Sequence, residues 1–318
     1  MANSTRLTAG IDTSKAKLDV AIHGQTRGCV FENNPAGWQV LQAHLTQEGV
    51  GRVGIEATGG YERGVTRHLQ AAGFTVTVLQ PLQVKAFAKL HLRRAKTDRI
   101  DAFLIAACTH LLDAETKMAP DPRFDALGDH LTYIEQLQED IVRLKTRLEH
   151  SADERLRRLV TADIKRLQKR RNEELKRLQA TLQSHVDLAR RLDLVVSVVG
   201  IGAITALSIV VRLPELGQLS REEVASLAGL APFVHQSGKR KGETHIGGGR
   251  ARLRRAPYAA AQPASFRWNP ALQALYRRLT ERGKSHKSAL VACARKLLVY
   301  ANAVVQRGTP WTASLAAA

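Results

Sequence analysis

Four acidic residues have the positions and spacing for divalent-metal chemistry. Asp12 and Glu56 each close a short apolar run, and Asp98 and Asp101 are three residues apart. Residues at i and i+3 share one face of a helix, so this pair could meet the two strand-end acids. Mg²⁺ prefers hard oxygen ligands, and two divalent ions about 3.5–4 Å apart promote phosphodiester exchange. The four acids are therefore a candidate metal site acting on a polyanion, although each alone is also typical of a turn or a helix cap.

A serine lies in a cationic stretch far from these acids. Ser237 precedes a glycine within 231–242, where Lys239, Arg240 and Lys241 follow it. A serine hydroxyl can displace a phosphodiester oxygen and keep the DNA end as a covalent ester. Neighbouring cations would stabilise the charge that develops on phosphorus. From residue chemistry alone, the alternative that Ser-Gly simply forms a turn stays open.

The charge of the chain indicates a phosphate-rich partner. Its 318 residues carry 48 Lys and Arg against 29 Asp and Glu, a formal net charge of +19. Such an excess favours nucleic acid first and an anionic membrane surface second, with a solvated basic surface as the plain alternative. Segment 238–255 is the most basic, and a second basic segment spans 269–287. The predicted phosphate contacts are Lys96, Lys239, Arg240, Lys241, Arg250, Arg252, Arg254, Arg255, Lys284 and Lys287.

Cysteine usage and the first residues argue against secretion and zinc binding. The three cysteines, Cys29, Cys108 and Cys293, form no CxxC pair. This excludes a zinc knuckle or a disulfide framework and fits a reducing cytoplasm. Residues 1–6 lack the apolar core of a signal peptide. We therefore expect a cytoplasmic protein.

The first 118 residues alternate short apolar runs with amphipathic ones. We predict strands at 7–12, 18–23, 28–31, 53–56 and 75–79, and helices at 38–45, 62–72, 82–89 and 98–112. Three early strands followed by alternating strand and helix indicate an α/β layer fold with a mixed sheet. Asp19 alternates outward in this pattern, so we expect it to face solvent.

The middle of the chain predicts two long helices. Between Gly128 and Gly200 there is no Gly or Pro. Apolar residues at alternating spacings of three and four form a coiled-coil stripe: Ile134, Leu137, Ile141, Leu144 and Leu148. A less regular stripe follows over 156–182, and 150–153 is expected to turn the chain.

From Leu194 onward we expect a mainly helical unit. No charged residue occurs in 194–211, which just reaches membrane-spanning length. Gly200 and Gly202 divide this run, so we reject a membrane span. Segment 199–206 is similar to a helix-hairpin-helix turn, whose amides approach phosphate, with a kinked core helix as the alternative. Pro257 and Pro263 predict a helix that is kinked or starts late.

Several of these stretches recur in one family in the same order. They are 10–15, 55–59, 96–98 with Asp101, 229–232, 236–238 and 253–255. Together they resemble the DEDD transposases of bacterial insertion sequences, the IS110 family. The resemblance extends from about residue 7 to residue 311. Trp268 or Tyr258 in the C-terminal part could stack on a base or belong to the core.

The resemblance implies both a fold and a mechanism. It implies an RNase H-like (RuvC-like) α/β domain over 1–120, coiled-coil helices over 121–193 and a mainly α-helical transposase domain over 194–318. Asp12, Glu56, Asp98 and Asp101 would bind Mg²⁺ or Mn²⁺, and Ser237 would be the nucleophile that becomes linked to DNA. It implies an RNA-guided serine recombinase, in which a structured non-coding RNA pairs with donor and target DNA.

The resemblance also implies an assembly. Dimers would assemble into a tetramer in the bacterial cytoplasm, near the nucleoid, without a membrane partner. Three alternatives remain: a RuvC-type junction-resolving nuclease that uses water, a non-catalytic RNA-binding protein, and an actin-like ATPase. The last is suggested by the similarity of 10–14 to a phosphate loop, but 56–61 is a poor match to the second loop that this class needs.

Overall fold

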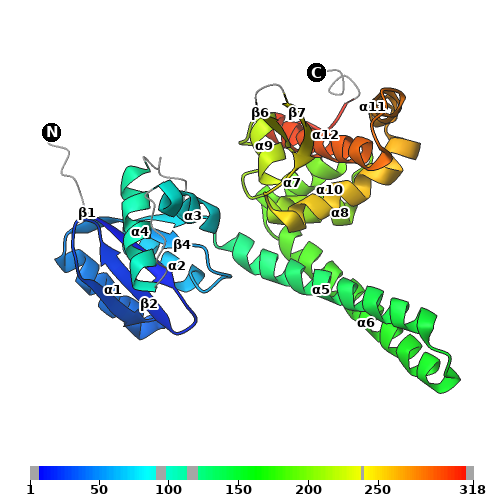
Figure 1. Ribbon diagram of the computed structural model, residues 1–318. Helices are drawn as coiled ribbons and strands as arrows, with labels where there is room; N and C mark the ends of the chain where they lie inside the picture. Colours follow the sequence, from blue (N-terminus) through cyan, green and yellow to red (C-terminus); the bar gives the residue numbers. More distant parts are fainter. Residues whose placement is uncertain (1–6, 91–97, 113–120, 238–239, 313–318) are drawn as a thin grey trace. The chain divides into compact units, whose positions relative to one another are not determined.

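The computed structural model describes residues 7–90, 98–112, 121–237 and 240–312, with the side chains of 98–100 and 234–244 outside the description. The chain divides into two compact units, Met1–Ala119 and Pro120–Ala318. Figure 1 shows both units, which are described separately below. The predicted three-part division, with a boundary after residue 193, stays a prediction.

The N-terminal unit contains a five-stranded mixed sheet, as the sequence predicts (Figure 1). Its order is β3-β2-β1-β4-β5, with the first three strands antiparallel and the last two parallel to β1. The strands are β1 (Leu7–Thr13), β2 (Lys17–Ile22), β3 (Gly28–Glu32), β4 (Val50–Glu56) and β5 (Thr75–Leu79). The helices are α1 (Pro35–Gln47), α2 (Arg63–Ala71), α3 (Pro81–Leu90) and α4 (Asp98–Leu111). All nine predicted elements are confirmed, with ends shifted by a few residues.

The two faces of the sheet pack against different helices. Ile11 and Ile55 are fully buried and pack in one core with Leu41 of α1 and Leu69 of α2. Because side chains alternate along a strand, the residues on either side of these isoleucines face the other way. That opposite face is covered by α4.

Helix α4 lies unusually close to the sheet because two strand residues are glycines. A Cβ on Gly10 would overlap the backbone of Ala102 and Ala106, and a Cβ on Gly54 would overlap Thr109. The α4 side chain of Ile105 is fully buried with Leu79 and Val84. The position of α4 over β1 and β4 therefore depends on the absence of these two side chains.

The second unit begins with a long antiparallel pair of helices, α5 (Arg123–His150) and α6 (Glu154–Gln183). The predicted turn between them is confirmed, and Asp153 caps α6 by accepting a hydrogen bond from the Leu156 amide. Leu131 and Ile134 of α5 and Leu178 and Leu182 of α6 are buried in one core with the helices that follow. The base of the helical pair is thus continuous with the rest of its unit.

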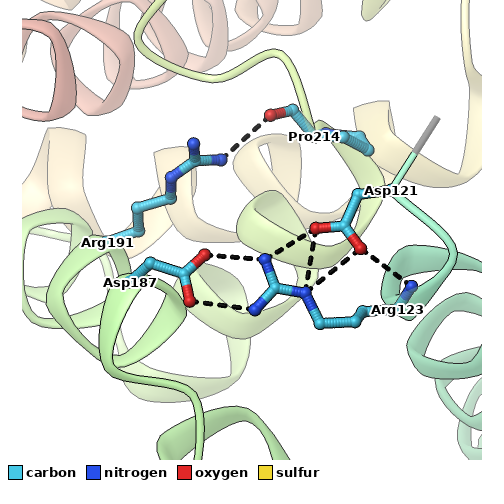
Figure 2. A network of polar contacts seen from close by, with 5 residues as sticks. All are labelled: Asp121, Arg123, Asp187, Arg191 and Pro214. Atoms are coloured by element: carbon cyan, nitrogen blue, oxygen red, sulfur yellow. Dashed lines mark hydrogen bonds and ion pairs between the residues drawn. The ribbon is translucent and has the colours of Figure 1, made fainter. Parts of the chain in front are cut away.

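An arginine joins the start of α5 to the helix that follows α6, α7 (Val186–Val196). Figure 2 shows Arg123 between two carboxylates: it donates to Asp121 at 2.6–3.1 Å and to both oxygens of Asp187 at 2.8 and 2.9 Å. Nearby, Arg191 of α7 donates to the carbonyl of Pro214. Bidentate arginine–carboxylate pairs fix orientation as well as distance. This network therefore fixes the start of α5 relative to α7.

The remaining elements are mainly helical, as predicted, but include a β-hairpin that the sequence analysis missed. They are α8 (Ala203–Arg212), α9 (Arg221–Leu227), β6 (Pro232–Ser237), β7 (Arg240–Ile246), α10 (Ala251–Pro263), the π-helix η1 (Ala264–Trp268), α11 (Pro270–Glu281) and α12 (His286–Arg307). Helix α10 starts at Ala251 and contains both Pro257 and Pro263, so the expectation of a helix that is kinked or starts later than in relatives stays a prediction.

One helix of the described residues is long and apolar enough to cross a membrane by composition. This is α12, and about half of its most apolar window, 56%, is buried inside the unit. Its Cys293, Leu297 and Ala301 are fully buried in the core. The helix therefore has the character of a core helix. The uncharged run 194–211 is divided between α7 and α8.

The close packing of α4 on Gly10 predicts that two Gly→Ala substitutions have opposite effects on the stability of the protein. Gly10→Ala should destabilise the protein by about 1–3 kcal/mol, because α4 must move away from β1. Gly128→Ala, in the interior of α5 with only an ordinary contact to Arg212, should stabilise it by about 0.5–1 kcal/mol. Differential scanning calorimetry of the full chain measures both. Equal effects of the two substitutions would contradict the close packing of α4.

The Arg123 network predicts a pH-dependent stability difference. The hydrogen bonds from Arg123 hold the pKa values of Asp121 and Asp187 below the ordinary 3.8. Carboxyl groups with a depressed folded-state pKa stabilise the fold above the unfolded value and lose that contribution as pH falls through the folded value. Arg123→Met should therefore lower the urea midpoint at pH 7, and its difference from wild type should shrink below about pH 4. A difference that grows on acidification would contradict this assignment.

Candidate functional site

Asp12 and Glu56 are neighbours on two parallel strands. Ile11 of β1 pairs with Ile55 of β4, so the two acids come next along adjacent strands, which lie about 4.8 Å apart. Both isoleucines point into the core beneath α1 and α2. Asp12 and Glu56 therefore project from the face that α4 covers, and both are half-buried there. The register therefore places these two strand ends side by side.

The orientation of α4 brings its first turn toward the strand ends that carry Asp12 and Glu56. At its C-terminal end, Arg52 donates to the carbonyls of Thr109 and Leu112, and His110 stacks on His23 with ring centroids 4.1 Å apart. Arg52 lies near the start of β4, and His23 lies beside the start of β1, so both are at the end of the sheet far from Asp12. The N-terminal end of α4, which begins at Asp98 and contains Asp101, is therefore directed toward the carboxyl ends of β1 and β4.

The donor set fits a hard divalent cation in chemistry, since all four predicted ligands are carboxylates. Asp101 is half-buried, and the side chain of Asp98 lies outside the description. Among the side chains that the structure describes, no group of three or more His, Cys, Asp or Glu is arranged to hold a metal ion. The metal site of four acids thus stays a prediction, supported by the backbone arrangement.

Asp19 is an acid that the sequence analysis assigned wrongly. It is the direct register partner of Asp12 across the antiparallel pair β1–β2. Opposite residues of such a pair share a face of the sheet, so Asp19 lies on the α4 side instead of facing bulk solvent. It is half-buried and lines a small cavity with Cys29 and Ala102. The signal was available in the sequence, because the short turn after Asp12 fixes the pairing of the two aspartates.

Ser237 is the last residue of β6, in the second unit. It pairs in register with Arg240, the first residue of β7, and Gln236 pairs with Lys241. The backbone therefore places the predicted nucleophile at the tip of a β-hairpin, beside two of the predicted cations. Lys239, like Lys96, lies outside the described residues.

The four predicted phosphate-binding arginines at the start of α10 have partners within the chain. Arg250 makes a two-point contact to Glu215 at 2.6 and 2.8 Å, and Arg254 donates to the carbonyls of Gly229 and Gly248. Two others contact acids of α5: Arg252 with Glu135 at 2.5 Å, and Arg255 with Glu139 at 2.7 Å. Lys284 and Lys287 are exposed around the start of α12. Phosphate binding by all of these residues stays a prediction.

Glu135 is the centre of a charged cluster that joins three helices. It accepts hydrogen bonds from Arg252 of α10 and from Arg212 of α8, the latter at 2.9 Å. The Arg212 side chain is only 15% exposed, and burial lowers its pKa against the opposing effect of Glu135. This carboxylate therefore compensates two cations, one of which has little water around it.

The glycine turn of 199–206 joins α7 and α8, as the helix-hairpin-helix comparison predicts. Gly200 has φ +102°, and a Cβ there would overlap Ala264. Gly202 precedes α8 in extended backbone, with open space around it. Of the two aromatic residues considered for base stacking, Tyr258 packs against the core, whereas Trp268 is 57% exposed.

The chain is similar to known transposases over most of its length. Residues 9–156 match the sequence model of the DEDD transposases of the IS110 type, and residues 192–277 match that of the transposase IS116/IS110/IS902 family. The pilin gene-inverting proteins of Moraxella bovis and Moraxella lacunata are each 28% identical to it over 314 residues, which cover 95% of this chain and 96% of each relative. The first match contains the four predicted acids, and the second contains Ser237.

The contacts of Glu135 predict that its substitution lowers stability more than substitution of Glu139, its neighbour on α5. Glu135→Gln should destabilise the protein by about 2–4 kcal/mol, because it removes the main compensating charge of the buried Arg212. Glu139→Gln, one turn further along α5, removes a pair whose Arg255 side chain is 66% exposed and should have a much smaller effect. Urea unfolding compares the two variants. Similar losses would show that Glu135 has no special role.

Proposed function

Since this chain belongs to the IS110 family of transposases, we propose that it cuts and rejoins DNA under the guidance of a structured non-coding RNA. The chain is a DNA transposase or recombinase by its family. The observation that carries the mechanism is the meeting of Asp12 and Glu56 on adjacent strands, with the first turn of α4 directed at them. This arrangement fits the RNase H-like fold of DEDD domains.

In this proposal, Asp12, Glu56, Asp98 and Asp101 hold Mg²⁺ or Mn²⁺. Such an ion, when bound, shields the negative charge of the phosphate that reacts. The half-buried setting of Asp12, Glu56 and Asp101, where α4 lies close to the sheet, would restrict the movement of these three carboxylates before DNA arrives. Preorganised charge of this kind has more effect than groups that must move during the reaction.

Ser237 supplies the nucleophile in the proposed reaction. Its hydroxyl oxygen loses its proton and forms a bond to phosphorus, while the bond from phosphorus to one DNA oxygen breaks. That DNA oxygen takes up one proton, so the proton lost by the serine is balanced. The DNA end remains as a phosphoserine ester. Attack by the hydroxyl of a new DNA end reverses these steps and releases the serine. Because a phosphoester replaces a phosphoester, no external energy source is needed.

The acids and the serine belong to different units of the chain. We propose that one active site takes them from different subunits, in dimers that assemble into a tetramer. Guide RNA would read donor and target DNA by base pairing, so the protein would contribute charge and shape recognition. The +19 net charge supports binding of both nucleic acids. The names of the Moraxella relatives refer to inversion of a gene, and an inversion also requires strands to be cut and rejoined.

The serine is tested by trapping the covalent intermediate. Protein, element RNA and labelled DNA with Mg²⁺ should give a protease-sensitive DNA adduct, which Ser237→Ala should abolish because the ester oxygen is gone. Ser226→Ala, at an exposed serine of α9, is the matched control and should retain the adduct. An undiminished adduct in Ser237→Ala refutes the nucleophile.

The main alternative is a RuvC-type junction-resolving nuclease that uses water, since the acids alone form a complete unit for that reaction. Asp12→Asn should reduce cleavage at least 100-fold in either case, because it weakens metal binding. Only the water mechanism predicts full cleavage by Ser237→Ala. Gel analysis of junction and linear DNA substrates separates the two mechanisms.

A further inference from the structure

Three aromatic side chains gather on the surface where η1, α11 and α12 meet. We call Phe266, Tyr276 and His286 the aromatic cluster. The ring of Tyr276 is edge-on to that of Phe266, at a centroid distance of 4.9 Å and an angle of 70°. The Tyr276 hydroxyl and Nδ1 of His286 share a hydrogen bond of 2.6 Å. The ring of Phe266 is thus held by its neighbours and is nearly parallel to His286.

The Phe266 ring is nevertheless 51% exposed. The backbone beneath it is fixed: Asn269 is fully buried, donates to the carbonyl of Val199 and accepts from the Leu272 amide. Ala264, at the start of η1, is fully buried as well. A large apolar ring kept in place while half of it faces water is a preorganised contact surface, and short π-helical segments frequently occur at functional sites.

The segment that carries the aromatic cluster is rich in exposed cations. Between Phe266 and Ser288 the chain has six Arg or Lys residues and a single acid, Glu281. The basic residues are Arg267, Arg277, Arg278, Arg282, Lys284 and Lys287, all of them exposed. This differs from the start of α10, where the arginines bond to carboxylates and carbonyls of the same chain. These six cations, called the rim below, make the segment complementary to a polyanion.

We propose that the exposed face of Phe266 stacks on an unpaired nucleobase, while cations of the rim contact the adjoining phosphates. Aromatic faces and positive rims are the two features that single-stranded nucleic acids need, since every base has a π-face and each phosphate a charge. Bases inside a duplex are not available for such stacking. Tyr276 and His286 act as positioning residues that hold the ring. The site rests on the proposed function only in that its ligand is nucleic acid.

The unpaired strand could be RNA or DNA, and the test distinguishes these sources. The full-length protein, in EDTA so that no cleavage occurs, is titrated into short oligonucleotides that carry a fluorescent 2-aminopurine. Single-stranded RNA, single-stranded DNA and the corresponding duplexes are compared. Wild type should change the fluorescence of at least one unpaired strand and bind the duplexes without that change. The strand with the larger response identifies the source.

Phe266→Leu keeps apolar bulk but removes the π-face and should weaken binding of the unpaired strand roughly 5- to 100-fold. Phe266→Tyr should restore both affinity and fluorescence change. Tyr133→Leu, at a 37% exposed aromatic residue of α5, is the control and should bind as wild type does. Thermal unfolding checks that each variant is folded.

The proposal is overturned if Phe266→Leu binds the unpaired strands as tightly as wild type with an unchanged fluorescence response. It is also overturned if Phe266→Leu loses duplex and single-strand affinity equally, or if its only effect is on the oligomeric mass by light scattering, which would make the cluster a contact between copies of the chain. Because the assay needs neither metal nor strand exchange, its failure is separate from failure of the proposed reaction.

Discussion

The close contact between α4 and the sheet is the constraint on which the N-terminal unit depends. Gly10 and Gly54 have no room for a Cβ, because the backbone of α4 lies directly against β1 at Gly10 and the side chain of Thr109 fills the space at Gly54. Two residues further along each strand are Asp12 and Glu56. The same contact that packs the helix therefore places its first turn, with Asp98 and Asp101, at the edge where the strand-end acids project.

In the second unit, much of the positive charge has a structural role. Glu135, Glu139 and Glu215 bind arginines at the start of α10 that the sequence analysis assigned to nucleic acid. Glu135 also binds Arg212 of α8. These contacts connect the long helical pair to the helices that carry the β-hairpin of Ser237. Among the described residues, the six exposed cations between Arg267 and Lys287 make no such contact with these acids.

The sequence predicts the sheet well, because the apolar alternation of β1 and β4 and the turns between strands are local signals. It failed where the outcome depends on a partner in space. Asp19 was expected to face solvent because its own strand alternates that way, but its pairing with Asp12 puts it on the α4 face. The hairpin of β6 and β7 was missed because glycines and cations suggested a loop. The contacts of the α10 arginines were missed since the acids that bind them are distant in sequence.

The central claim is that acids on two strands and one helix form a single metal site. Diffraction from crystals soaked in Mn²⁺, recorded at the manganese absorption edge, tests it most directly. The account predicts anomalous peaks within about 2.0–2.4 Å of carboxylate oxygens of Asp12, Glu56 and the acids of α4. Peaks bound elsewhere, or a Glu56 side chain and an α4 first turn directed away from Asp12, would contradict it.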